Sequence, residues 1–220
     1  MKILTAILIL IVLFILYNLY EIRKDKSNKL LINIDGKLVE IDDTRLKKRN
    51  KPSHLYTEEE GIVNKLLEDV NKNVIVLIKH LNIKYKDTIN VGIIDGISKL
   101  NNNYKYENLI EHIPKWYSDE TSYTVNKGEI LALCLRHKDI PQKFHDMNVI
   151  MFVTIHELSH IFSESVGHND EFWINFKFLL NEAIEANIYE FDDYSKQNKQ
   201  YCGMEINYTP LTDFSLPNLI

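Results

Sequence analysis

The segment HELSHIFSESVGHNDEFW, residues 156–173, places several potential metal ligands within eighteen positions. His156 and His160 are four residues apart, so on a helix they lie on one face, where both imidazoles can reach a zinc ion at about 2.0–2.1 Å. Glu157 is rotated by about 100° from His156 and can contact a bound water instead. The pattern predicts a zinc-bound water that loses its proton to Glu157 and attacks a carbonyl, after which the same glutamate delivers the proton to the leaving amine.

The helix expected around this motif is MNVIMFVTIHELSHIFSES, with Asp146 as its N-cap. Its apolar residues surround the cylinder, which predicts a mostly buried helix. Polar, titratable side chains inside such a helix carry a desolvation cost of about several kcal/mol, which metal coordination would offset. This context favours a zinc site over a chance occurrence of the short HExxH pattern.

The third ligand has two candidates, His168 and Glu182. Gly167 can adopt the left-handed conformation that ends a helix, so His168 would follow with freedom to face the metal. On a helix from about Glu171 to Tyr189, Glu182 falls roughly 130° from the apolar face, with Glu185 nearly opposite that face. That apolar face is centred on Phe172, Phe176, Leu179, Leu180 and Ala183. We therefore expect His168 to be the ligand and both glutamates to lie on a solvated surface, with Glu182 as the alternative.

Other residues could support the site. Tyr123, Tyr201 and Tyr208 could donate to an oxyanion, but structural packing is the favoured role for each in a chain with twelve tyrosines. The oxyanion-stabilising residue is therefore not assigned. Phe172 and Trp173 are expected to hold the loop after His168 on the core.

The two cysteines, Cys134 and Cys202, are too few for a disulfide framework, and their separation does not resemble paired zinc ligands. We expect free thiols in a reducing compartment, with Cys202 as a half-buried thiol rather than a switch that binds zinc.

HELSH followed by GHNDEFW resembles the WLM and SprT-like zinc metallopeptidases, in which a third histidine and then a Phe follow HExxH. TSYTVNKGEILALCLRH before the motif, and EFWINFKFLLNEAIEANIYE with YCGMEI after it, are similar to WLM-type peptidases of large DNA viruses. The resemblance covers roughly residues 120–206. It implies a zincin-type α+β core, with His156, His160 and His168 as metal ligands and Glu157 as catalytic acid and base. Seven residues separate His160 from His168, a longer spacing than in the better-known family pattern.

The predicted fold is α+β, with a small mixed or antiparallel sheet packed on the HExxH helix. Thr57 and Glu60 form a capping box that opens a helix with a regular apolar stripe. Residues 122–135 predict a hairpin with its turn at Asn126 to Gly128, and its strand serves either as an edge for an extended peptide or as a structural core strand. Residues 84–118 are weakly patterned and predict mixed loop and short elements.

The N-terminal run ILTAILILIVLFILYNLY, residues 3–20, has no charged side chain and is nearly long enough to cross a bilayer as a helix. No small-x-small cleavage site follows it, so residues 1–21 predict a retained single-pass transmembrane anchor and the lipid bilayer as a partner. Basic residues on its C-terminal flank place the domain on the cytosolic side. Residues 22–56 are expected to form a juxtamembrane hairpin, with its turn at Asp35 and Gly36, followed by a basic linker. Residues 57–220 are expected to form the metallopeptidase domain.

Charge is unevenly distributed. Residues 21–51 carry ten Lys and Arg against six Asp and Glu, whereas residues 52–220 carry fifteen against twenty-five. Nucleic acid is therefore an unfavourable partner for the acidic domain, and a protein or peptide is the expected substrate.

These features together predict a membrane-anchored zinc endopeptidase. The alternative is a non-catalytic, membrane-tethered interaction module in which the same three histidines hold structural zinc. Glu157 favours catalysis, because a structural site needs a closed fourth ligand and no adjacent base.

Overall fold

The computed structural model describes residues 15–16, 29–34, 37–42, 57–115, 117 and 119–219. The chain divides into two compact units, Met1–Lys48 and Arg49–Ile220. The predicted domain boundaries at residues 21 and 56 stay a prediction.

The described part of the first unit contains the predicted hairpin. Strands β1 (Lys29–Ile34) and β2 (Lys37–Asp42) pair antiparallel, and the Ile34–Lys37 pair leaves two residues for the turn. The predicted anchor lies outside the described residues except for residues 15–16, which are helical, and the predicted linker up to residue 56 lies outside them. Within the described residues, no helix combines the length and the apolar character needed to cross a membrane.

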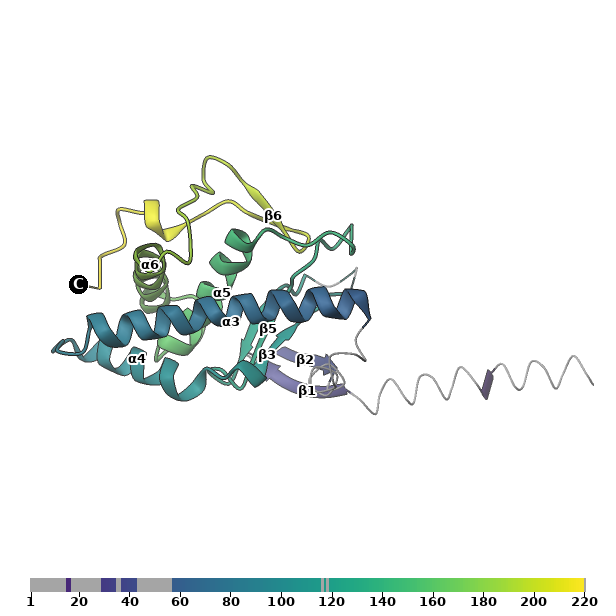
Figure 1. The fold of residues 1–220 in the computed structure, drawn as a ribbon, viewed down its shortest axis with the longest axis horizontal. Helices are drawn as coiled ribbons and strands as arrows, with labels where there is room; N and C mark the ends of the chain where they lie inside the picture. Colours follow the sequence, from purple (N-terminus) through teal and green to yellow (C-terminus); the bar gives the residue numbers. More distant parts are fainter. Residues whose placement is uncertain are drawn as a thin grey trace, which may run out of the picture. The chain divides into compact units, whose positions relative to one another are not determined.

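The second unit is the predicted α+β domain (Figure 1). Its helices are α3 (Glu58–Lys84), α4 (Val91–Asn103), α5 (Met147–Phe162) and α6 (Asp170–Glu185), with short 3-10 helices η2 (Tyr106–Asn108) and η3 (Pro210–Thr212). Its strands are β3 (Leu109–Glu111), β4 (Tyr123–Val125), β5 (Ile130–Leu133), β6 (Lys199–Tyr201) and β7 (Met204–Ile206).

A three-stranded mixed sheet packs on the HExxH helix, as predicted. The strand order is β3-β5-β4, with β3 parallel and β4 antiparallel to β5. All four residues of β5 are buried, and α5 contacts both β4 and β5. The β4–β5 turn has the positive φ angles expected of a tight hairpin at Asn126 (44°), Lys127 (57°) and Gly128 (112°). The hairpin predicted over residues 122–135 is therefore confirmed.

Helix α3 begins with the predicted capping box. The Thr57 hydroxyl accepts from the Glu60 amide, and the Glu60 side chain accepts from the Thr57 amide. The helix runs along the second unit (Figure 1) and buries one apolar stripe against it. The buried stripe consists of Val63, Leu67, Val70, Val74, Leu77, Ile78 and Leu81.

Helix α4 was not expected, because its sequence VGIIDGISKLNNN is poor in strong helix formers. Its stability comes from packing, since Ile93, Ile97 and Leu100 are buried at helical spacing. A Cβ at Gly96 would lie 2.3 Å from the Phe162 ring, so only glycine allows this close approach of α4 to α5.

The expectation of free thiols is wrong, because Cys134 and Cys202 form a disulfide with a Cα–Cα distance of 6.1 Å. The β6–β7 hairpin turns at Cys202 and Gly203, both with positive φ, and so brings Cys202 to the end of β5. The Cys202 amide also donates to Nε2 of His145 at 3.1 Å. Burial lowers the pKa of His145 to about 4, which keeps this ring neutral and able to accept. Sequence spacing gives no signal for a pairing made by tertiary packing.

Reducing this disulfide should lower the free energy of unfolding of the full chain by about 4 kcal/mol, because the closed loop regains entropy in the unfolded state. The two cysteines are 68 residues apart, and the loop includes both α5 and α6. Chemical denaturation with and without reductant measures the change. The Cys134→Ala/Cys202→Ala double variant is the control and should not respond to reductant. Equal stability of oxidised and reduced wild-type protein would contradict the pairing.

Candidate metal centre

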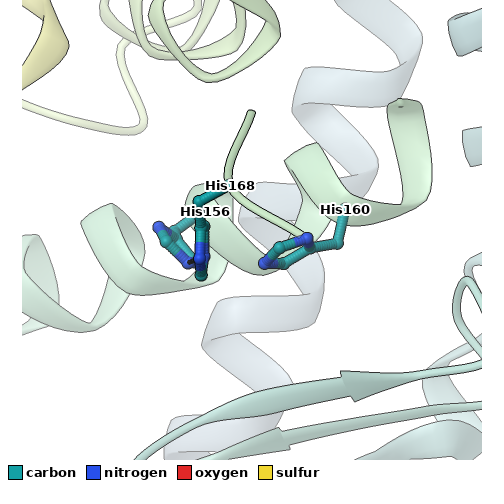
Figure 2. Close-up of side chains that lie close together, drawn as sticks. All are labelled: His156, His160 and His168. Carbon is teal, nitrogen blue, oxygen red and sulfur yellow. Dashed lines mark hydrogen bonds between the residues drawn. The ribbon is translucent and has the colours of Figure 1, made fainter. Parts of the chain in front are cut away.

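The three predicted histidines converge on one point. His156 and His160 project from one face of α5, and His168 reaches them from the loop before α6 (Figure 2). One ring nitrogen from each histidine lies within 4.8 Å of the other two. The Nε2 atoms of His156 and His168 are 2.9 Å apart. Residues twelve positions apart in the sequence thus form a single cluster of nitrogen donors.

This donor set fits a metal ion. A tetrahedral ion with bonds of about 2.0–2.1 Å needs ligand nitrogens about 3.4 Å apart, within the range of separations seen here. Burial, followed by the neighbouring histidines, lowers the pKa of His156 well below its usual value, and burial lowers that of His160 to about 3. The imidazoles of His156 and His160 are therefore neutral, which is the form that binds metals. His168 is exposed, so the cluster is open to solvent on one side.

Glu157 directly follows His156 in α5 and is only 3% exposed. Its Oε2 accepts a hydrogen bond of 2.8 Å from the Thr124 hydroxyl on β4. Burial raises the pKa of the Glu157 carboxyl to about 7, although the hydrogen bond from Thr124 opposes this shift. A carboxyl with this pKa can both take and return a proton near neutral pH.

The loop between α5 and α6 is fixed by charged side chains. Lys127, in the β4–β5 turn, donates to the carbonyls of Ser163 and Ser165. The Glu171 carboxylate accepts from the amides of Glu164 (2.7 Å) and Ser165 (3.0 Å). Ser163 is the C-cap of α5, and because carbonyls at a helix end lack partners within the helix, Lys127 supplies a donor to this one.

His168 itself is held from the side of α6. Asn169 caps α6 by accepting from the Phe172 amide at 3.1 Å, and the Trp173 indole donates to the His168 carbonyl at 3.1 Å. The buried Phe172 ring lies 4.4–4.8 Å, centroid to centroid, from all three imidazoles. The predicted role of Phe172 and Trp173 is therefore confirmed. Gly167 has the predicted positive φ of 84°, but it lies within the loop rather than at the end of α5.

Glu182 does not join the three histidines. Its carboxylate accepts from Lys84 Nζ at 3.0 Å, from the Tyr85 hydroxyl at 2.7 Å and contacts His80 Nε2 at 2.8 Å, all on or just after α3. It is 4% exposed, so the expected solvated surface is wrong for this residue, whereas Glu185 is exposed as expected. Glu182 does lie away from the face of α6 that packs on α5, as its angle from the apolar face predicted. It is buried nevertheless, because α3 packs on this other side of α6.

The candidate tyrosines are engaged elsewhere or packed. The Tyr201 hydroxyl is buried and lies 2.6 Å from Ser122 Oγ. The Tyr208 hydroxyl donates to Asp213 at 3.0 Å, and the Tyr123 ring packs against His112.

A cavity of about 660 Å³ lies elsewhere, between α6 and the C-terminal segment. Lys177, Phe178 and Glu182 line it from α6, and none of the three clustered histidines does. The three clustered histidines and Glu157 therefore lie outside this cavity.

The WLM domain family matches residues 98–213, just over half of the chain, and this range includes the three histidines and Glu157. This chain belongs to the WLM domain family. The WLM match begins within α4 and ends just after η3, so it takes in the mixed sheet, α5, α6 and the β6–β7 hairpin. The resemblance stated from the sequence is thereby confirmed.

Viral proteins are among the relatives of this WLM chain. Uncharacterized protein R325 of Acanthamoeba polyphaga mimivirus is 40% identical over 111 residues, which is 50% of this chain and 55% of that protein. Uncharacterized protein 042R of Invertebrate iridescent virus 3 is 38% identical over 91 residues, 41% of this chain and 54% of that protein. The matched segment thus spans about half the length of these relatives.

Among solved structures, two crystal structures of Wss1 from Saccharomyces cerevisiae are similar to this chain, one of them of a mutant. Their sequence identities are 25% and, for the mutant, 24%, and both similarities cover 44% of this chain. They cover 77% and 78% of the Wss1 chains, and each TM-score is 0.35. The family assignment rests on the domain match and not on this structural similarity.

Three supporting residues of this WLM domain were not predicted, namely Thr124, Lys127 and Glu171. Each acts through a contact to a segment distant in sequence or to loop backbone. A threonine in a short strand and a lysine in a turn are common, so the sequence carried no signal for either role. Glu171 stands in the first turn of α6, where an acidic residue is expected in any helix.

Substitutions can distinguish His168 from Glu182 as the third metal ligand. His168→Ala should weaken zinc binding by more than about 100-fold, because a direct ligand contributes more than an outer-shell partner. Glu182→Ala should keep zinc binding but lose about 1–3 kcal/mol of stability, since it leaves the α3 donors without their buried acceptor. Chelator competition and thermal denaturation of the full chain measure both effects. Loss of zinc from the glutamate variant alone would overturn the choice of ligand.

Proposed function

We propose that this chain is a zinc-dependent metallopeptidase that hydrolyses peptide bonds, with His156, His160 and His168 as zinc ligands and Glu157 as the catalytic base and acid. The observation that carries the proposal is the meeting of three imidazoles, one of which directly precedes a buried carboxyl in α5. Membership of the WLM family, which is associated with zinc metalloprotease activity, supports the same chemistry.

The proposed hydrolysis assigns metal binding to the histidines and proton transfer to Glu157. Zinc, when bound, would polarise the substrate carbonyl and make water more acidic. Glu157 takes a proton from water, so that the water oxygen bonds to the peptide carbon. The same carboxyl then gives that proton to the amide nitrogen as the C–N bond breaks. Because its pKa is raised to about 7 by burial, Glu157 can perform both transfers near neutral pH.

Strand β4 is a suitable place for an extended peptide. Among the described residues it pairs with β5 on one side only, and it also contacts α5. A peptide that added to this edge would gain main-chain hydrogen bonds that do not depend on its sequence. This favours the edge role for β4 over a purely structural one, and it fits a protein or peptide as substrate.

Replacement of Glu157 by glutamine tests the proposal. Glu157→Gln should keep zinc and stability but lower peptide cleavage by more than about 100-fold, because the amide cannot accept the proton from water. The full chain is loaded with zinc and incubated with a proteome-derived peptide library, and mass spectrometry identifies the products. Glu190→Gln, at an exposed position on the surface, is the matched control and should cleave as the wild type does.

Equal cleavage by the wild type and Glu157→Gln would rule out this mechanism. Zinc binding without any cleavage by the wild type would instead indicate the non-catalytic, zinc-stabilised interaction module.

The membrane anchor over residues 1–21 is a further proposal that rests on the sequence alone, and the placement of the domain on the cytosolic side rests on the flanking basic residues. The full chain should float with lipid vesicles in a density gradient, whereas a chain beginning at Pro52 should not. Sedimentation of both chains away from the vesicles would contradict the anchor.

A further inference from the structure

Glu157 is a buried carboxyl that has a single side-chain hydrogen-bond partner in the described part of the chain. Among the described residues, the hydrogen bonds of its carboxylate come from the Thr124 hydroxyl alone, at 2.8 Å to Oε2. A buried carboxylate normally accepts several hydrogen bonds, so the loss of this one would leave it without a partner among the residues that the structure describes. No hydrogen bond from a described residue reaches the second oxygen, Oε1.

Thr124 contacts Glu157 at two points. Besides the carboxylate, its Oγ1 lies 3.2 Å from the backbone carbonyl oxygen of Glu157. A hydroxyl placed between the end of a side chain and the backbone of the same residue restricts the rotation of that side chain. The contact therefore fixes the carboxylate relative to α5, which also carries His156 and His160.

Thr124 is itself rigidly held. Within β4 it is paired with Leu131 of β5, and its β-branched side chain has few accessible rotamers. Two residues earlier, Ser122 Oγ accepts from the Cys134 amide at 3.0 Å and lies 2.6 Å from the Tyr201 hydroxyl. The start of the strand is thus bonded to Cys134, one end of the disulfide, and to Tyr201, the neighbour of the other end.

We propose that Thr124 is a positioning residue that orients the Glu157 carboxylate for proton transfer. The inference rests on the proposed peptidase function and adds to it a residue outside the HExxH motif. Thr124 acts through Glu157 and does not need to touch the metal. Its loss should therefore reduce the rate of the chemical step more than substrate binding.

The test compares Thr124→Val, which keeps the shape but removes the hydroxyl, with Thr124→Ser, which keeps the hydroxyl. Thr124→Val should lower kcat by about 10- to 100-fold, the range expected for one hydrogen bond to a charged group, with KM changed less than about twofold. Thr124→Ser should restore most of kcat. The assay uses the zinc-loaded full chain and the best-cleaved peptide from the library.

Two further measurements distinguish an orienting role of Thr124 from a general loss of protein stability. Zinc affinity should be the same in the wild type and Thr124→Val, and crystal structures should show one Glu157 carboxylate orientation in the wild type but a changed or multiple orientation in the variant. Thr154→Val is the matched control, because Thr154 is a fully buried residue on α5 whose hydroxyl donates within its own helix, to the Ile150 carbonyl. This control should lose stability without the fall in kcat. Thr124→Ala provides a second hydroxyl-free variant if the valine protein does not fold.

The outcomes are distinct. If Glu157→Gln is inactive but Thr124→Val and Thr124→Ala keep full kcat and an unchanged Glu157 orientation, the positioning role is wrong and the peptidase function stands. If Glu157→Gln is fully active, the peptidase mechanism itself is wrong. A fall in kcat that is as large in Thr124→Ser as in Thr124→Val would also overturn the role of the hydroxyl.

Discussion

The return of the chain after α5 is the constraint on which the candidate metal centre depends. Helix geometry alone brings His156 and His160 together, because residues four apart share a face. The third imidazole lies beyond the end of the helix, so the chain must turn back to bring it to the other two. The chain reaches His168 only after a loop that lacks regular structure up to Asn169. Such a loop places a ligand well only if its backbone is tied down, and here charged side chains hold its first half while α6 holds its second.

One hairpin supports both parts of the reactive site. Thr124, in β4, holds Glu157, and Lys127, in the turn that follows, holds the loop that carries His168. The proposed proton transfer and metal binding would therefore share one hairpin, which is bonded in turn to β5 and, through Ser122, to Cys134 and Tyr201. Among the described residues this strand pairs with β5 alone, so the proposed substrate edge, base and third ligand all adjoin one hairpin.

Local chemistry explains which features could be predicted from the sequence. The HExxH helix with its Asp146 cap, the Thr57 capping box and the β4–β5 hairpin depend on residues close in sequence, and all are present. Contacts between distant elements were missed. Helix α3 covers Glu182, and the β6–β7 hairpin places Cys202 against Cys134. Neither contact could be predicted, because contacts between distant elements produce no pattern in the local sequence. The long spacing between His160 and His168 could be read from the sequence, but the side chains that hold this loop in place, Lys127 and Glu171, could not be identified from it.

The central claim is that three imidazoles hold one zinc ion with a position left open for water. X-ray absorption at the zinc edge of the full chain tests this claim most directly, because it counts and identifies the ligand atoms. The account predicts three imidazole nitrogens at about 2.0–2.1 Å and the remaining ligand an oxygen. Fewer than three imidazoles, or sulfur from Cys134 or Cys202 bound to the zinc, would contradict it.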